Sequence, residues 1–448
     1  MRDVIANGVA EPGPPIGVTS KLIKSPHMDC EPECRAPALP SPGLVVKIRS
    51  VSTSADSSKV AVIGGSLGGL TAALVLRDAG CDVTVYERSQ MELQGLGAGI
   101  VVQEATVRYP LERLGTTLDD ISVSARVLQY LVADGAVMFE RPSPYRFTAW
   151  NTMYRSLIGA LGGAAYRRGH ALVGFDADDT GVDVRFSNGH TERVDLLICV
   201  DGVASTARRR LLPGVEPSYS GYVAWRGTVT ESLLSPQTFA VLSDAITYGL
   251  APNSHIVAYQ IPNVSGGMEE GERLVNFVWY RNVAEGAELD ELMTDRDGLP
   301  RPLSLHPGIV QDRYVEAIHR TAEDVLPDPL AEMVVRTPQP FVQTIVDIEV
   351  PQMVFGRVCL MGDAAFTARP HAAASTAKAA ENGWALARAL TAADRDIDAA
   401  LAAWQPGQLE LGRNLVARAR DVGERSQFRG TWVPGDPELR FGLFGPGQ

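Results

Sequence analysis

The apolar and polar positions near residue 60 follow the order strand, loop, helix, strand. Lys59–Ile63 is an almost wholly apolar run that ends at glycine, which is typical of a strand buried on both faces. From Ser66 to Gly80 leucine and alanine recur at roughly helical spacing, and glycine suits the position just past a helix. Asp82–Glu87 predicts a second strand. Together these segments predict one β-α-β unit with parallel strands.

Two segments further along carry local signals. Thr152–Arg168 has helical spacing, although two glycines interrupt it, and we predict a helix there. Gly181–Val200 predicts a hairpin whose turn falls at Asn188-Gly189, since this dipeptide accepts the positive φ of a two-residue loop. We expect Leu196–Val200 to be the buried second arm of that hairpin.

The pattern changes near residue 219. From Tyr219 to about Arg281 polar and apolar positions alternate in runs that contain Tyr, Trp and Val, which favours an antiparallel sheet with one covered face. Arg357–Met361 returns to the pattern of a buried strand, and Ala, Leu and Arg then predict helix from Ala372 to about Arg425. The sequence therefore predicts an α/β domain interrupted by a β-rich insert, with C-terminal helices.

Composition narrows the possible partners. The chain has 448 residues, and 41 Lys and Arg against 53 Asp and Glu leave a net charge of −12. Nucleic acid and anionic membranes attract the opposite charge, so we expect neither as a partner. No run approaches 18 apolar residues, so we predict no membrane span.

The first 58 residues differ from the rest of the chain. They hold eight of the 29 prolines and no sustained strand or helix period, which predicts a disordered extension rather than a targeting peptide. The five cysteines are scattered and lack the paired spacing of a zinc site, so we predict no metal. They indicate a reducing compartment, and we expect a cytoplasmic protein.

A glycine-rich loop, Gly64-Gly65-Ser66-Leu67-Gly68-Gly69, joins the first predicted strand to the first helix. Such a loop lets a pyrophosphate approach a helix N-terminus, where free N–H groups favour negative charge. Glu87 ends the next strand, where an acid can accept hydrogen bonds from ribose hydroxyls. This unit alone leaves open a nicotinamide nucleotide, a flavin nucleotide and a tight turn without a ligand.

Two later segments favour a flavin. Cys199–Arg210 (CVDGVASTARRR) and Arg357–Arg369 (RVCLMGDAAFTAR) each place Asp and Gly directly after a buried strand. With VYERS, YVAWRG, FVWYRN and RPHAA, these segments make the chain resemble the single-component (class A) FAD-dependent aromatic monooxygenases from about Lys59 to the C-terminus. Within that family it looks most like the hydroxylases of hydroxylated N-heterocycles.

The resemblance implies both a reaction and an architecture. The reaction uses noncovalent FAD, NADH or NADPH as a transient reductant, and dioxygen, and it hydroxylates a small electron-rich aromatic or N-heteroaromatic substrate through a flavin hydroperoxide. The architecture is a Rossmann-like FAD-binding domain with a parallel sheet, in two parts at 59–218 and 341–448, the second including the C-terminal helices. Residues 219–340 between them form a mostly antiparallel substrate domain.

The resemblance also assigns cofactor contacts. Gly64, Ser66 and Leu67 line the pyrophosphate, and Glu87 and Arg88 take the adenosine end. It further implies that Arg155 faces a phosphate and that Gln103 lies at the flavin edge. Asp201 would hold the loop that covers the dinucleotide, and Asp363 would contact the ribityl–pyrophosphate region.

The segment after Asp363 bears on the flavin ring itself. Pro370 fits the first turn of a long helix whose N-terminus would stabilise the anionic reduced flavin. The family commonly has glycine where Ser375 stands and often an acid where Asn382 stands. A side chain at Ser375 would crowd the flavin if the backbone passes close to it.

For the substrate, a base with a pKa near neutral would help by deprotonating a ring hydroxyl. We expect His371, and after it His255, in this catalytic role, with Tyr222 and Tyr259 as substrate contacts. Four alternatives stay open: a nicotinamide-dependent dehydrogenase, a flavoprotein oxidase or epoxidase, an inactive FAD-binding homologue, and an acidic scaffold protein. A homodimer is the expected assembly on general grounds.

Overall fold

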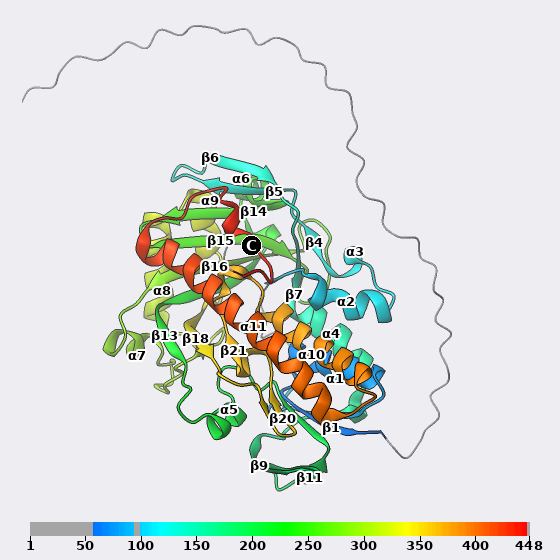
Figure 1. The fold of residues 1–448 in the computed structure, drawn as a ribbon. Helices are drawn as coiled ribbons and strands as arrows, with labels where there is room; N and C mark the ends of the chain where they lie inside the picture. The colour runs from blue at the N-terminus through cyan, green and yellow to red at the C-terminus, as the bar shows by residue number, and fades with distance from the viewer. Residues whose placement is uncertain (1–56, 94–98, 446–448) are drawn as a thin grey trace, which may run out of the picture. The chain divides into compact units, whose positions relative to one another are not determined.

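Two large sheets organise the part of the chain that the structure, a computed structural model, describes: residues 57–93 and 99–445 (Figure 1). These residues belong to one compact unit. The predicted disordered extension lies outside the described residues, apart from its last two positions.

The first large sheet is mostly parallel and contains the predicted β-α-β unit. β1 pairs in parallel with β2 on one side and β12 on the other, and β12 pairs in parallel with β20. The strands in order across the sheet are β19 (Val354–Phe355), β20 (Val358–Leu360), β12 (Leu196–Cys199), β1 (Lys59–Ile63), β2 (Asp82–Tyr86) and β8 (Tyr166–Arg167). Because helices cover it, its central strands are buried along almost their whole length.

The glycine loop requires glycine at its first position. Gly64 has φ +108°, and a Cβ there would lie 2.4 Å from the carbonyl oxygen of Val200. The loop leads into α1 (Leu67–Asp78), which packs against α4 (Trp150–Leu161) and α10 (Ser375–Ala392). The sequence therefore turns sharply from β1 into α1 at the carboxyl ends of the parallel strands.

The second large sheet is antiparallel except where β14 pairs in parallel with β5. Its order is β17 (Ser304–Leu305), β18 (Phe341–Glu349), β13 (Ser218–Thr230), β16 (Leu274–Asn282), β15 (Ser254–Ile261), β14 (Ala245–Ala251), β5 (Val127–Leu131) and β6 (Val137–Pro142), with β21 (Phe366–Thr367) beside β18. Thus β5 and β6, which lie within 59–218, join this sheet rather than the parallel one.

Period-two alternation sorts the side chains of this sheet onto two faces. On β13, Val223 and Trp225 pack into a core with α8 (Asp312–Val325) and α9 (Asp328–Val335). Tyr222 and Ala224 pack into a second, aromatic core on the opposite face. The face that carries the tyrosines is therefore the one that turns away from α8 and α9.

Two smaller sheets correct one prediction. The hairpin turns at Asn188-Gly189 as expected, but its second arm is β11 (Thr191–Val194), paired with β10 (Gly181–Phe186) and, through it, β9 (Leu172–Asp178). Leu196–Cys199 is instead β12 of the parallel sheet, because all four residues are buried between β1 and β20. The other small sheet joins β3 (Gly99–Val101), β7 (Arg146–Ala149) and β4 (Val123–Ser124).

The helices also differ from the predictions at their ends. The helix predicted over Thr152–Arg168 ends at Leu161, because Gly162 adopts φ +83°. Pro370 lies in a short 3₁₀ turn, Pro370–Ala372, before α10 begins. The predicted long C-terminal helix is two helices, α10 and α11 (Ile397–Glu424), separated by a turn with two positive-φ residues. The remaining α-helices are α2 (Glu104–Arg113), α3 (Leu118–Ile121), α5 (Thr206–Leu211), α6 (Pro236–Leu242) and α7 (Ala287–Leu292).

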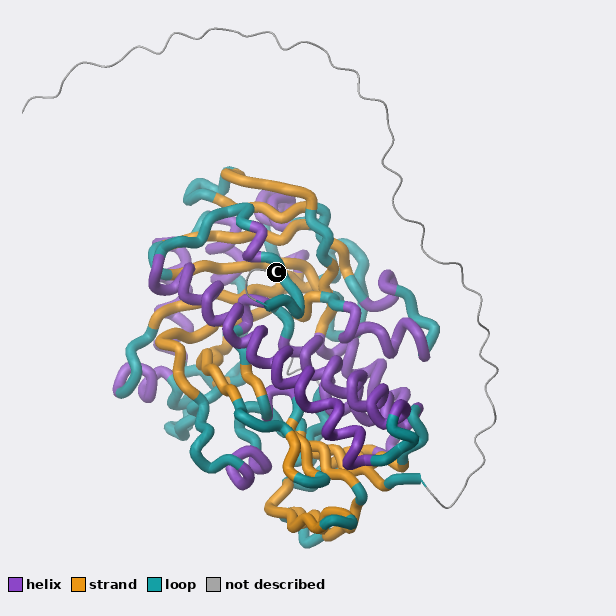
Figure 2. The backbone as a smooth tube through the Cα atoms, viewed as in Figure 1, coloured by secondary structure: helices purple, strands orange, loops and turns teal. Residues whose placement is uncertain are grey.

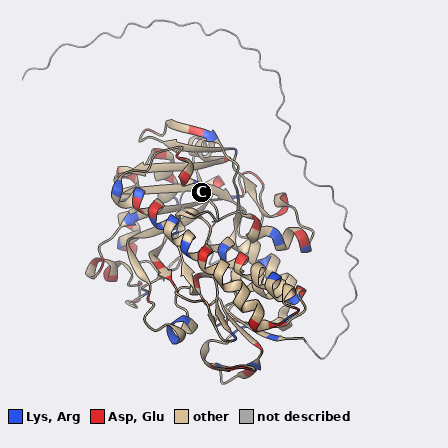
Figure 3. Ribbon diagram, in the orientation of Figure 1, with Lys and Arg blue, Asp and Glu red and all other residues tan. Residues whose placement is uncertain are grey.

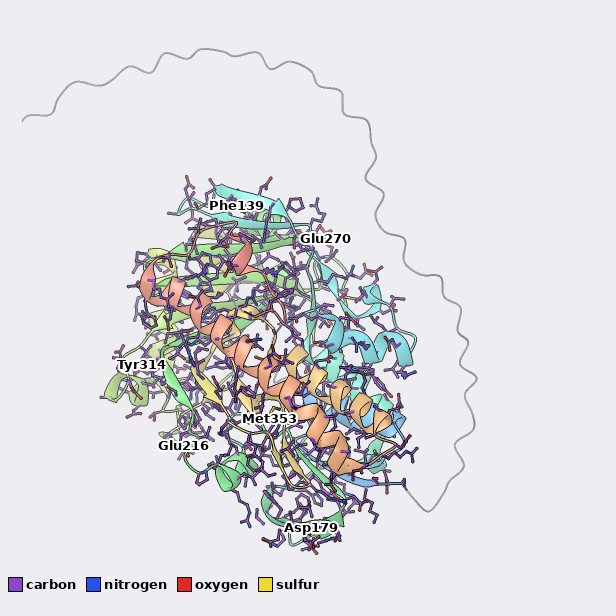
Figure 4. The ribbon with its side chains drawn as sticks, in the orientation of Figure 1. Phe139, Asp179, Glu216, Glu270, Tyr314 and Met353 are labelled. Carbon is purple, nitrogen blue, oxygen red and sulfur yellow. The ribbon has the colours of Figure 1, made fainter. Side chains whose placement is uncertain are left out.

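Helix α11 runs along both large sheets, and Figure 2 shows it as a long purple tube over the strands. Gln405 on α11 accepts hydrogen bonds from the backbone amides of Met353 and Val354, each at 2.9 Å; Figure 4 labels Met353. Acidic and basic residues both occur along α11 (Figure 3). The predicted fold class, α/β with an antiparallel insert and C-terminal helices, is confirmed. Among the described helices, none has the length and apolarity to cross a membrane.

Candidate functional site

A cavity of about 420 Å³ lies between the tyrosine-bearing face of the large sheet and the segment that follows β20. Strands β13 to β16 and β18 supply its sheet wall, which is rich in aromatic side chains. The opposite wall comes from residues 363–376, at the start of α10. The cavity therefore joins the two parts of the chain that the sequence linked to substrate and to cofactor.

The two predicted histidines meet in this cavity although they come from β15 and from the segment before α10. The ring centroids of His255 and His371 lie 5.3 Å apart, and both rings line the cavity. Tyr280 stands beside both, 4.7 Å from His255 and 4.3 Å from His371 between ring centroids. Both histidines are almost completely buried.

Of the two predicted substrate tyrosines, Tyr259 lines the cavity, whereas Tyr222 is not among the residues that line it. Tyr222 is fully buried, and its hydroxyl oxygen lies 2.8 Å from Nε2 of His371. Tyr259 lines the cavity, donates to the carbonyl of Gly99 at 3.3 Å and stacks on Phe147 with ring centroids 4.0 Å apart. Burial raises the pKa of Tyr259 to about 12, so this phenol keeps its proton at neutral pH.

The expectation of a base with a pKa near neutral needs correction. Burial lowers the pKa of His255 to about 3. Burial, His255 and Arg369 together lower the pKa of His371 well below its ordinary value. Because desolvation disfavours the charged imidazolium, both side chains are neutral imidazoles at pH 7.

Arg226, Tyr280 and Trp432 are among the cavity residues that were not predicted from the sequence. Arg226 lines the sheet wall, donates from Nη1 to Oε1 of Gln343 at 2.8 Å, and has a buried Nε without a partner. Period two on β13 places Arg226 on the face of Tyr222, and this was the available signal. Tyr280 had the same kind of signal within FVWYRN, whereas Trp432 lies beyond α11 and had none.

The glycine loop forms one end of the predicted cofactor region. Ser66 is exposed at the N-cap of α1, and Leu67 is buried behind it. Glu87 is buried, and its two carboxylate oxygens accept hydrogen bonds from the amides of Gly65 and Ser89, each at 2.8 Å. Glu87 thus holds the loop in place, while Arg88 beside it is exposed.

The acids that follow β12 and β20 occupy different settings. Oδ2 of Asp201 accepts from the amide of Thr206 at 2.7 Å, whereas its Oδ1 is buried without a partner. Asp363 lines the cavity and pairs with Nζ of Lys378 at 2.8 Å. Lys378 is 1% exposed and also donates to the carbonyl of Phe366. The sequence analysis did not identify this buried lysine.

The structure also places two further predicted cofactor contacts, Gln103 and Arg155, and the two positions at which the sequence departs from the family, Ser375 and Asn382. Gln103 donates to the carbonyl of Ala373 at 2.6 Å, and Arg155 donates to the carbonyl of Val264 in the connection between β15 and β16. Ser375 is the first residue of α10 and lines the cavity. Asn382 accepts from the amide of Gly362 at 2.9 Å and donates to Gln408 at 2.8 Å, so its amide is satisfied where an acid is common.

These features fit a bound dinucleotide. The tight approach at Gly64 leaves a backbone cradle at the start of α1. Asp201 keeps a buried carboxylate oxygen free to accept a hydrogen bond, and the N-terminus of α10 opens onto the cavity. Donors and acceptors therefore stand at three places: the glycine loop, Asp201 and the N-terminus of α10.

Comparisons with known proteins agree with this arrangement. A family model described as FAD binding domain-like matches residues 219–347. The chain is 41% identical over 392 residues to 2,6-dihydroxypyridine 3-monooxygenase of Paenarthrobacter nicotinovorans, covering 87% of this chain and 97% of that protein. It is 28% identical over 401 residues to a 3-amino-4-hydroxybenzoate 2-monooxygenase of Streptomyces platensis, covering 86% and 92%.

A solved structure is similar over the same length. The structure of 2,6-dihydroxypyridine-3-hydroxylase from Arthrobacter nicotinovorans matches with a TM-score of 0.81 and 41% identity, covering 87% of this chain and 98% of that one.

Proposed function

Because the chain belongs to the family of FAD-dependent aromatic and heteroaromatic monooxygenases, we propose that it hydroxylates a ring of the hydroxypyridine class in the aromatic cavity. It is an enzyme, and FAD is its cofactor. NADH or NADPH serves as the transient reductant, and dioxygen supplies the oxygen atom.

One observation supports this proposal: residues proposed to hold the cofactor and residues proposed to hold the substrate line the same cavity. Asp363 and Ser375 belong to the first group, and His255, Tyr280 and Arg226 belong to the second. A ring bound at the sheet wall would face a cofactor bound along the N-terminus of α10. This is the juxtaposition that oxygen transfer from cofactor to ring requires.

The chain's own residues hold the cofactor. When bound and reduced, FAD supplies the activation of dioxygen. Gly64, Ser66 and Leu67 would hold the pyrophosphate. Glu87 and Arg88 would contact the adenosine end, and Asp363 would contact the ribityl region. Gln103, Arg155 and Asp201 would make the remaining contacts with the cofactor. The amides at the start of α10 favour negative charge next to the cavity.

The sheet wall holds the substrate. Stacked aromatic side chains exclude water and offer flat surfaces to a planar ring. Tyr259 fixes the wall at Gly99, and His371 and His255 contact a ring hydroxyl, with Tyr222 behind His371. Arg226 offers its unpartnered Nε to a second polar substituent.

The choice of a hydroxylated N-heterocycle rests on the relative whose name specifies 2,6-dihydroxypyridine, at 41% identity over most of both chains. The cavity supports the choice, because polar side chains line it together with aromatic and aliphatic ones. A purely hydrocarbon ring would leave those buried polar groups unpaired.

Two further proposals concern the setting of the enzyme. Cys81, Cys199 and Cys359 are free thiols, which suits the reducing cytoplasm. We propose a homodimer, the commonest closed assembly of soluble enzymes, and light scattering of the full chain would test it.

The experiment follows NADH and NADPH oxidation by the FAD-loaded chain with hydroxypyridines, phenols and indoles, with mass analysis of each product. The proposal expects oxidation that depends on one class of ring and a product heavier by one oxygen atom. NADH oxidation that ignores the ring would instead favour an oxidase, the alternative raised by Ser375 on the cavity wall.

A further inference from the structure

The last described residues of the chain border the cavity. After α11 and a short π-helical turn, Arg425–Arg429, residues 430–445 return to the large antiparallel sheet, and we call this segment the C-terminal strap (Figure 1). Trp432 and Phe441 belong to the strap, pack on the aromatic core of the sheet and line the cavity. The strap therefore adds a third wall to the cavity, besides the sheet and the segment before α10.

Trp432 extends the aromatic wall of the sheet. Its ring centroid lies 4.4 Å from that of His255 and 6.0 Å from that of Tyr248. Its Nε1 donates to the hydroxyl oxygen of Tyr130 on β5 at 3.2 Å. Just before the strap, Oγ of Ser426 lies 2.6 Å from Nδ1 of His255. Because the indole N–H is satisfied, Trp432 can present an apolar surface to a planar ring.

The other end of the strap is bonded to both sides of the cavity. The amide of Phe441 donates to the hydroxyl oxygen of Tyr145 at 3.1 Å, and the two ring centroids lie 4.9 Å apart. The amide of Gly442 donates to the carbonyl of Ala372 at 3.0 Å, in the segment before α10. The strap thus connects the substrate wall with the segment expected to carry the cofactor.

Arg418 on α11 holds the strap from behind. Its side chain is buried, Nη1 donates to the carbonyl of Gly442 at 3.1 Å, and Nη2 donates to the carbonyls of Glu438, at 3.2 Å, and Arg440. Its guanidinium carbon lies 5.7 Å from the ring centroid of Phe444. Every guanidinium hydrogen bond that Arg418 makes to a described residue therefore ends on the strap. The planar fork of donors suits several carbonyls at once.

Arg418 and the strap depend on each other. A buried guanidinium is costly unless its donors are paired, and the strap carbonyls pair them. Within its described residues the strap has one short 3₁₀ turn, Pro437–Leu439, so little of its backbone is held by its own secondary structure. Arg425 adds ion pairs with Asp436 and Glu438, at 2.8 and 3.4 Å. The course of the strap is thus set largely by side chains of α11 and the turn after it.

Building on the proposed function, we propose that Arg418 is a positioning residue that holds the C-terminal strap over a bound ring. Arg418 does not itself line the cavity, so it acts through Trp432 and Phe441, which do. With the strap in place, these two aromatic side chains contact the ring and keep water out of the cavity. Exclusion of water protects a reactive site from side reactions.

The two outcomes of turnover are balanced as follows. In coupled turnover NADH gives a hydride, solvent gives a proton, one atom of dioxygen replaces a ring C–H by C–OH, and the other atom leaves as water. In uncoupled turnover the same hydride and proton convert dioxygen into hydrogen peroxide, and the ring is unchanged. A displaced strap admits water and shifts turnover toward the second outcome.

The test compares Arg418→Met with a matched control in the FAD-loaded chain. Arg413 also lies on α11, but its Nη2 donates to the carbonyl of Pro351 at 3.5 Å, so Arg413→Met leaves the strap in place. Binding of 2,6-dihydroxypyridine is measured by the change in flavin absorbance without NADH, and coupling by the hydroxylated product formed per NADH oxidised.

The inference expects three changes in Arg418→Met and none in Arg413→Met. The dissociation constant of the ring rises about tenfold, the order of effect when an aromatic wall no longer packs on it. The product per NADH falls about twofold or more, with hydrogen peroxide making up the difference. Amide hydrogen exchange across residues 430–445 becomes faster. A merely structural role would lower the melting temperature and leave ring binding and coupling unchanged in the folded variant.

A second variant keeps the inference falsifiable if Arg418→Met does not fold. Trp432 is only partly buried, so Trp432→Ala should fold, and it should weaken ring binding and coupling in the same direction. Normal ring binding and coupling in folded Arg418→Met or in Trp432→Ala overturns the inference and leaves the hydroxylase proposal standing. If the parent chain binds and hydroxylates no ring, the proposed function fails, and the inference that rests on it fails too.

Discussion

The hydroxyl oxygen of Tyr222 lies 2.8 Å from Nε2 of His371, although 149 positions separate the two residues in the chain. Tyr222 belongs to β13 of the large sheet, and His371 belongs to the segment between β21 and α10. One hydrogen bond thus ties the substrate wall to the segment expected to carry the cofactor. A change behind this bond should affect both stability and substrate binding.

The first prediction concerns the buried ion pair behind Tyr222. Asp347 accepts from Arg369 and Arg420, and the side chains of Asp347 and Arg369 are 8% and 7% exposed. Asp347→Ala leaves Arg369 buried without its carboxylate, and we expect a loss of about 3–5 kcal/mol in the free energy of unfolding. Denaturant unfolding would measure it.

A double variant provides the control for that pair. Asp347→Leu with Arg369→Met replaces both charges by apolar groups, so we expect a smaller loss than for Asp347→Ala alone. A double variant at least as unstable as the single one would show that lost packing, and not the unpaired charge, causes the destabilisation.

The second prediction concerns the glycine loop. At Gly64 a side chain meets the Val200 carbonyl and a positive φ, so Gly64→Ala should cost at least about 2 kcal/mol and reduce FAD retention. The matched control is Gly159→Ala in α4, where nothing lies within 4 Å and alanine should stabilise by about 0.5–1 kcal/mol. The flavin-to-protein ratio after gel filtration measures FAD retention in both variants. If the two variants retain FAD equally, Gly64 is not part of the cofactor site.

The third prediction separates two roles of Asp363. Asp363→Asn weakens FAD retention and also destabilises the fold by about 1–3 kcal/mol, because buried Lys378 loses its carboxylate. Adding Lys378→Met removes the unpaired charge, so thermal stability should recover while FAD retention stays low. Recovery of both properties would mean that Asp363 serves only Lys378.

The fourth prediction concerns pH. The pKa of His255 falls from about 6.5, its ordinary value, to about 3 when the chain folds. The unfolded chain therefore binds more protons between these values, and stability decreases as pH falls from about 6.5 toward about 3. His371 acts in the same direction. Urea unfolding across this range should show a steeper decrease for the parent than for His255→Asn; identical profiles would contradict the burial of a neutral His255.

Local signals predicted the elements that depend on local sequence. The run Lys59–Ile63, the glycine loop and the turn at Asn188-Gly189 each carry their own signal, and the structure has strand, loop and turn there. Leu196–Cys199 was predicted to pair within the hairpin, but it belongs to the parallel sheet. An apolar strand can be buried in either sheet, and its sequence does not specify which one.

The site was predicted by residue type and not by arrangement. His255 and His371 were identified singly, but their 5.3 Å separation depends on β15 meeting the segment before α10. Arg226 was not predicted as a site residue, although it lies in the segment YVAWRG. Ser426 could not be found at all, since only the path of the chain past α11 brings it to His255.

The most direct measurement of the central claim uses the FAD-loaded chain, NADH and a dihydroxypyridine under dioxygen labelled with heavy oxygen. The account predicts NADH oxidation that requires the ring and a product that contains one labelled oxygen atom. A product without label, or NADH consumption that yields only hydrogen peroxide, would contradict it.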